Sequence, residues 1–123
     1  MACHPVIMSV RRIVPDFQAQ DPAASREFYT EVLGLEVVMD QGWILTFAAP
    51  DNPTAQLSVM QQDASASVHP DASIEVDDVD AAHAEARRLG YEIVHPLTDE
   101  PWGVRRFFVR EPSGKVVKVL SHP

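Results

Sequence analysis

Polar side chains recur at every second position of four short, otherwise apolar runs of the chain. Alternate residues of an extended strand share one face, so each run would present a mixed face of polar and apolar groups. Carboxylates on such a face could bind a cation, and its amide, hydroxyl and amine groups could hydrogen-bond a small molecule. The mixed-face residues that form our candidate ligand site are Val14, Asp16, Gln56, Ser58, Asp71, Glu75 and Lys118.

Two tryptophans complete the candidate site. Trp43 begins the run WILTFAA at 43–49, and Trp102 lies in PWG at 101–103. An indole ring can stack on a flat ligand or attract a cation. Large aromatic side chains in a small domain are also common core residues, so both interpretations of each tryptophan stay open.

The remaining reactive side chains form no catalytic pattern. Cys3 does not stand at a predicted helix N-terminus that could activate its thiol, so no nucleophilic role is predicted for it. His69 stands two residues before Asp71, so a slip of two in strand register would place an imidazole at the position of that carboxylate. A metal set built from His69, Asp71 and Glu75 is therefore the alternative to a site that uses no metal.

A unit that occurs twice must position these residues. LGLEVV at 33–38 returns as LGYEIV at 89–94, and the glycine of each copy is placed to end a helix in the left-handed conformation. Helical spacing precedes each copy. In the first, Ala24, Phe28 and Val32 recur every four residues and would form the buried face.

The starts of both helices can also be predicted. Asp21 is a candidate N-cap for the first helix, with Pro22 at the first helical position, and Asp78 is a candidate N-cap for the second.

Strand-like runs surround each helix, and each half of the chain is predicted to be strand, helix, strand, strand, strand. The runs are 11–17, 35–39, 43–49 and 55–60 in the first half, and 72–76, 91–94, 104–109 and 115–121 in the second. One half is too small to bury both faces of its sheet. We therefore expect two modules, about 11–62 and 70–122, in one domain spanning 1–123. Uniformly apolar faces, such as that of Ile13 and Phe17, should pack on the helices and leave the mixed faces around a trough.

Composition excludes some classes of function. The net charge of −8 argues against nucleic acid as a partner. No apolar run has the length of a membrane span, and the basic pair Arg11-Arg12 follows the short apolar N-terminal stretch, the wrong order for a signal peptide. We expect a cytoplasmic protein that binds neither nucleic acid nor membrane.

Three segments resemble the vicinal oxygen chelate superfamily of glyoxalases, bleomycin resistance proteins and extradiol dioxygenases. They are DPAASREFYTEVLGLEV at 21–37, IEVDDVDAA at 74–82 and PWGVRRFFVREPSGKVVKVLSH at 101–122. The resemblance implies an α+β fold in which two βαβββ modules form a curved mixed sheet around a cavity. It also implies a homodimer.

Metal-dependent members of that superfamily hold a divalent ion with four side chains, and the resemblance places these positions at Val14, Gln56, Asp71 and Lys118. Valine has no donor atom, glutamine offers a neutral carbonyl and lysine would repel the ion. The resemblance then implies the metal-free branch, which contains drug-sequestering proteins of the bleomycin resistance type.

We therefore predict a metal-free small-molecule binding protein that uses no cofactor and sequesters a toxic or antibiotic compound. The acidic side chains and the tryptophans suggest a cationic or aromatic ligand. The alternative is a metal-dependent lyase, isomerase or dioxygenase of the same superfamily with a non-standard ligand set.

Overall fold

A computed structural model describes residues 9–62, 65–66 and 68–122. Its strands are β1 (Val10–Gln18), β2 (Glu36–Asp40), β3 (Ile44–Ala49), β4 (Asn52–Met60), β5 (Ala72–Val76), β6 (Ile93–Asp99), β7 (Arg105–Arg110) and β8 (Val116–Ser121). The helical elements are η1 (Pro22–Ser25), η2 (Phe28–Val32) and α1 (Val79–Arg88). All of these strands belong to one sheet, in the order β2-β3-β4-β1-β5-β8-β7-β6.

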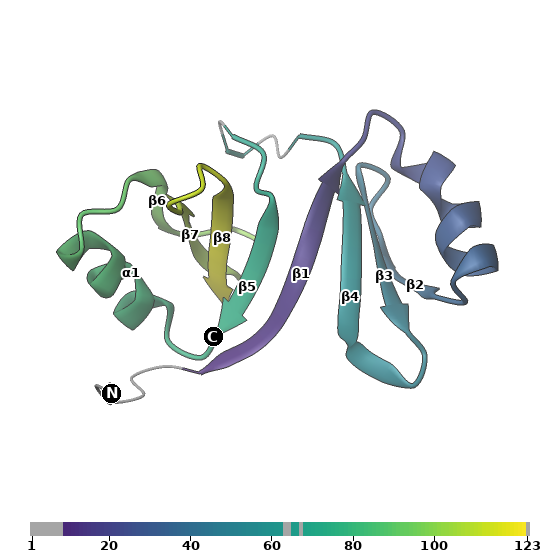
Figure 1. Ribbon diagram of the computed structural model, residues 1–123, viewed down its shortest axis with the longest axis horizontal. Coiled ribbons are helices and arrows are strands. Elements are labelled where there is room, and N and C mark those ends of the chain that lie inside the picture. Colours follow the sequence, from purple (N-terminus) through teal and green to yellow (C-terminus); the bar gives the residue numbers. More distant parts are fainter. Residues whose placement is uncertain (1–8, 63–64, 67, 123) are drawn as a thin grey trace.

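The two halves of the sheet meet at the antiparallel pair β1 and β5, where Val14 lies opposite Ser73. Within each half the first and last strands run parallel, β1 with β4 and β5 with β8. The helical segments lie at opposite ends of the molecule, outside the strands (Figure 1). This mixed sheet with helices on its outer side confirms the predicted α+β class.

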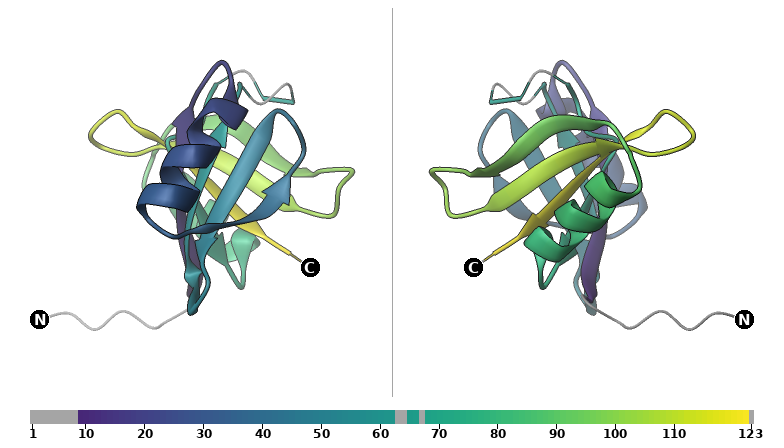
Figure 2. Two further views of the ribbon diagram at one scale, coloured as in Figure 1. Left: turned by 90° about the vertical axis from the view of Figure 1, so that its right-hand side faces the viewer. Right: turned by 90° about the vertical axis from the view of Figure 1, so that its left-hand side faces the viewer.

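The second helix follows its sequence signals. The Asp78 carboxylate accepts a hydrogen bond from the Ala81 amide at 3.0 Å, and Gly90 ends the helix with φ +81°. Viewed from this end of the molecule, α1 lies across the strands of the second half (Figure 2). Val79 of the helix packs with the buried side chains of Val76 and Phe107.

The first helical segment differs from the prediction. Pro22 does begin it, but the Asp21 side chain makes no capping hydrogen bond. The segment starts as a tight 3₁₀ turn and ends as a wide π turn, so its side chains do not follow the spacing of a regular α-helix. As a result Phe28 and Val32 are exposed, and Tyr29 packs against Phe47 with ring centroids 4.9 Å apart.

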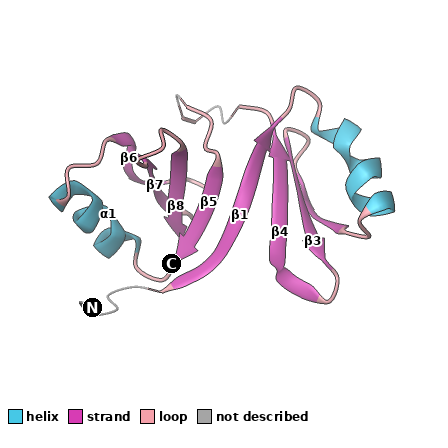
Figure 3. Ribbon diagram, in the orientation of Figure 1, coloured by secondary structure: helices cyan, strands magenta, loops and turns pink. Residues whose placement is uncertain are grey.

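The outer face of β1 also differs from the prediction. Ile13 and Phe17 should have packed on the helices, but they are 57% and 50% exposed. The reason is that η1 contacts β3 and β4 and α1 contacts β6, β7 and β8, so neither helix covers the central strand. The helices lie at the two flanks (Figure 3). No helix among the described residues is long and apolar enough to cross a bilayer.

Candidate functional site

The inward faces of strands from both halves line a cavity of about 940 Å³. Eight of the nine predicted site residues lie in its wall: Val14, Asp16, Trp43, Gln56, Ser58, Glu75, Trp102 and Lys118. They come from β1, β4, β5, β8, the residue before β3 and the turn before β7. The alternation along the strands thus locates a real cavity, while the binding of a ligand in it stays a prediction.

Asp71 is the predicted residue that does not line this cavity. It precedes β5, and its carboxylate accepts a hydrogen bond from the Val116 amide at 2.8 Å. Its own amide donates to the Val116 carbonyl at 2.8 Å. Asp71 therefore joins the starts of β5 and β8. Ser73, which was not predicted, occupies the place in the wall that was expected for Asp71, since it is paired with Val14 on one side and Lys118 on the other.

The resemblance placed the four metal positions at Val14, Gln56, Asp71 and Lys118, but in the structure the inward set is Val14, Gln56, Ser73 and Lys118. None of them supplies a carboxylate or an imidazole, so this set does not fit a divalent ion. The only donors that it offers are a neutral amide, a hydroxyl and a cationic amine.

The alternative metal set is not assembled either. His69 donates from Nε2 to the Asp16 carbonyl oxygen at 2.8 Å, and Glu75 forms ion pairs with other side chains. Asp71 is engaged with Val116. Within residues 9–62, 65–66 and 68–122, no three His, Cys, Asp or Glu side chains are grouped so that they could hold a metal ion.

Asp16 is the buried acid of the wall, with 4% of its surface exposed. The Ser73 hydroxyl donates to its carboxylate at 2.5 Å. Burial raises the pKa of Asp16 and outweighs the opposing effects of Lys118, the Ser73 hydrogen bond and His69. Asp16 is therefore a carboxyl group that takes up a proton more readily than an exposed aspartate does.

A second cluster of polar side chains links β1, β4 and β5 with the segment that follows β8. Arg12 Nε lies 2.9 Å from the Glu75 carboxylate, and Arg12 also donates to the Gln56 side-chain oxygen at 2.9 Å. His122 Nδ1 lies 2.8 Å from the other oxygen of Glu75. Burial opposes the charge of Glu75, but the His122 hydrogen bond and the Arg12 charge outweigh it and lower the pKa of Glu75. Arg12 and His122 are wall residues that the sequence prediction missed.

Arg106 is another missed residue, and it is among the most buried polar groups of the chain, with 2% of its surface exposed. Its Nε donates to the Glu100 carboxylate at 2.6 Å. Its guanidinium lies between two rings, 5.1 Å from the Trp102 centroid and 5.0 Å from the Phe108 centroid. The alternation of β7 was the available signal, since of Arg105 and Arg106 only one can point inward.

The two tryptophans do not belong to the core. Trp43 is 37% exposed and Trp102 is 56% exposed, and both contribute to the cavity wall. Trp43 directly precedes β3 in the first half of the sheet, and Trp102 lies in the turn before β7 in the second. Both indoles therefore lie on the cavity wall and not in the core, and their contact with a ligand stays a prediction.

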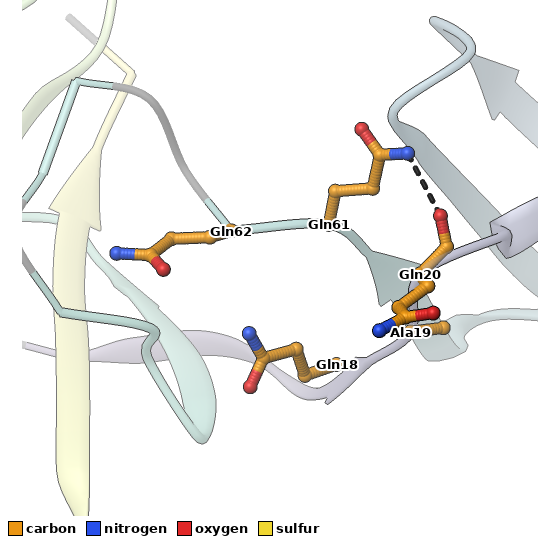
Figure 4. A pocket seen from close by; sticks show the side chains of 5 residues that line it. All are labelled: Gln18, Ala19, Gln20, Gln61 and Gln62. Atoms are coloured by element: carbon orange, nitrogen blue, oxygen red, sulfur yellow. Dashed lines mark hydrogen bonds between the residues drawn. The ribbon is translucent and has the colours of Figure 1, made fainter.

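A smaller depression of about 520 Å³ adjoins the cavity and shares Gln61 and Gln62 with it. Its other residues are Gln18, Ala19 and Gln20. Gln61 donates from its side-chain amide to the Gln20 carbonyl oxygen at 2.8 Å, while the Gln18 and Gln62 side chains extend into the space between the segments (Figure 4). The depression extends the cavity with neutral amide groups.

Comparison with known proteins agrees with this architecture. The family model "Glyoxalase/Bleomycin resistance protein/Dioxygenase superfamily" matches residues 10–119. A search of curated proteins finds no significant match.

Several solved structures share the fold. NAD-dependent benzaldehyde dehydrogenase from Legionella pneumophila is 19% identical with a TM-score of 0.71, over 90% of this chain and 99% of that one. A superfamily member from Vibrio splendidus 12B01 is 17% identical with a TM-score of 0.65, over 92% and 99%. Streptomyces coelicolor methylmalonyl-CoA epimerase is 20% identical with a TM-score of 0.64, over 92% and 98%. At such low identity these likenesses establish the fold alone.

Proposed function

The chain belongs to the glyoxalase/bleomycin resistance protein/dioxygenase superfamily, and on that premise we propose that it binds a small molecule in its cavity without a metal ion. The donor set supports the metal-free part of the proposal, because Val14, Gln56, Ser73 and Lys118 line the cavity in place of carboxylates and imidazoles. The volume of about 940 Å³ lies within the range of small-molecule sites.

The observation that carries the proposal is the pair of exposed tryptophans on the wall of one cavity. An exposed indole loses favourable burial, and two of them from different halves of the sheet offer flat apolar surface to the same space. Val38, Met39 and Ile44 add apolar groups near Trp43. The ligand that fits such a wall is a flat aromatic molecule with polar substituents.

The biological role that we propose is sequestration of a toxic or antibiotic compound. Reversible binding in a cavity requires only complementary walls, and it makes no use of a nucleophile or a Lewis acid. This role is supported by superfamily membership together with the donor set. The homodimer implied by the resemblance stays a prediction; we expect light scattering to give twice the mass of the chain, and a monomer at every concentration would contradict it.

Replacing either tryptophan should weaken the binding of a flat neutral probe such as 2-naphthamide. Stacking on an aromatic side chain contributes about 0.5–1.5 kcal/mol beyond area burial, so Trp43→Ala and Trp102→Ala should each raise the dissociation constant by about 2- to 10-fold. Fluorescence titration of wild type and variants measures this.

Phe28→Ala is the matched control, because Phe28 is an exposed aromatic residue that does not line the cavity. It should leave the dissociation constant unchanged. If the wild type shows no saturable binding of this probe or of other flat aromatic molecules, the proposed function is wrong.

A further inference from the structure

We infer that the cavity binds a flat aromatic anion, such as an arylcarboxylate, and not the cation that the acidity of the chain suggests. The inference rests on the proposed function and specifies the ligand of the same cavity.

The cavity wall does not share the strong negative charge of the chain. The chain has 10 Lys and Arg against 18 Asp and Glu, a net charge of −8. Among the described residues, the wall holds three of the bases, Arg12, Arg106 and Lys118, and two of the acids, Asp16 and Glu75. Its own side chains thus sum to 3 − 2 = +1, and the sum is 0 when Glu100, the buried ion-pair partner of Arg106 at 2.6 Å, is included. The acidic groups are concentrated elsewhere, so the net charge is a poor guide to the ligand.

Both carboxylates of the wall are already engaged. Glu75 is paired with Arg12 at 2.9 Å and His122 at 2.8 Å. Asp16 accepts the Ser73 hydroxyl and faces the positive charge of Lys118. A cationic ligand would have to compete with these partners for either acid, at the cost of leaving a wall cation without its counter-charge.

Trp102 is also poorly suited to a cationic ligand. One face of its ring is covered by the Arg106 guanidinium at 5.1 Å, while 56% of the residue stays exposed. A cation stacked on the open face would gain little, because the ring already interacts with a cation on its other face. An electron-rich or negatively charged ring meets no such competition.

The anionic group of the ligand should lie at the floor of the cavity, beside Lys118. Lys118 on β8 is paired with Ser73 on β5, whose hydroxyl contacts Asp16 on β1. The titratable groups that face Asp16 are Lys118, His69 and Asp71. An anion beside Lys118 would repel ionised Asp16, but burial makes this carboxyl group easy to protonate. A proton from solvent would therefore accompany the anion, and protonated Asp16 could donate a hydrogen bond to it.

Three matched probes test the inference: 2-naphthoate, 2-naphthamide and 2-naphthylmethylammonium, which share a ring system and differ in charge. We expect 2-naphthoate to bind wild-type protein about 10-fold more tightly than the amide, and the ammonium probe to bind most weakly. The affinity for 2-naphthoate should fall as the pH rises, because ionised Asp16 repels the ligand. Titration calorimetry in buffers of different ionisation enthalpy should detect proton uptake.

Variants locate the effect. Lys118→Met should remove the preference for 2-naphthoate over 2-naphthamide, and Lys118→Gln is the substitute if the first variant does not fold. Asp16→Asn should remove the pH dependence of 2-naphthoate binding. Lys115→Met is the control, because Lys115 is exposed in the turn before β8 and does not line the cavity; it should keep the wild-type preference.

The outcomes separate this inference from the proposed function. If the ammonium probe or the amide binds wild type as tightly as 2-naphthoate, the anion inference is wrong and the proposed function stands. If none of the three probes binds, both are wrong. If Lys115→Met loses the preference and Lys118→Met keeps it, the anionic group does not lie beside Lys118.

Discussion

Replacing Arg106 with methionine should lower the free energy of unfolding by about 3–5 kcal/mol, the usual cost of removing one partner of a buried ion pair. Arg106 and Glu100 are both buried, with 2% and 7% of their side chains exposed, and their closest charged atoms are 2.6 Å apart. The variant would leave the Glu100 carboxylate without its arginine partner in a poorly hydrated place, where its remaining contact with His95 is 3.5 Å long. It would also remove the guanidinium between Trp102 and Phe108. Urea unfolding measures the change.

The neighbouring arginine provides the matched control. Arg105 points outward and pairs with Asp80 at 2.8 Å and Asp99 at 3.1 Å, both largely exposed. Exposed pairs contribute about 0–1 kcal/mol, so Arg105→Met should have a small effect. The double variant Arg106→Met with Glu100→Gln should regain part of the lost stability, because no buried charge is left unpaired. Equal losses at Arg105 and Arg106 would contradict the buried pair.

The cavity wall could be predicted because strand alternation is a local property. Each run of five or six residues reveals its two faces without reference to any other run, and Gln56 and Ser58 were assigned correctly to the inner face in this way. The failure at Asp71 has a different origin. Asp71 shares the strand alternation of the wall residues Ser73 and Glu75, but the pairing of β5 with β8 directs its carboxylate to the Val116 amide. The register of that pairing cannot be predicted from the sequence of either strand alone.

The residues missed by sequence reasoning depend on contacts between distant segments. His122 acquires a role only because β8 ends beside Glu75. Arg106 acquires one because the turn before β7 returns Glu100 and Trp102 to its side chain. The prediction of the first helix failed for a local reason. The spacing of Phe28 and Val32 predicts a regular α-helix, but the segment forms a 3₁₀ turn followed by a π turn.

The net charge of the chain is also a poor predictor of the charge of its ligand. A net charge of −8 suggests a cationic ligand, but it is a sum over the chain and carries no information on where the charges lie. The fold assigns Arg12, Arg106 and Lys118 to the cavity wall and engages both carboxylates of that wall, so the wall does not favour a cation. Our inference of an anionic ligand follows from the distribution of charge.

The second large effect is expected in the core that supports the first half of the wall. Phe47 of β3 is 0% exposed and packs with Leu45, Val59 and Tyr29. Phe47→Ala should lower the free energy of unfolding by about 3–5 kcal/mol, because it removes a buried ring and leaves a cavity. The residue before it, Thr46, points inward and hydrogen-bonds Ser58 at 2.8 Å, so loss of the ring should also loosen the cavity wall. Thermal unfolding and urea titration measure the change.

Phe28→Ala is the appropriate comparison, since it deletes the same atoms from a residue that is 52% exposed. Phe28 contacts the Tyr29 ring edge to face at 5.1 Å, and such a contact is worth about 0.5–1.5 kcal/mol. The ratio of the two losses therefore tests the winding of the first helical segment. If Phe28→Ala were as destabilising as Phe47→Ala, the segment would have to be a regular helix with Phe28 on its buried side, as the residue spacing predicts. If only Phe47→Ala lowers the free energy of unfolding strongly, the segment must combine the 3₁₀ and π turns, which direct Tyr29 toward the sheet and leave Phe28 exposed.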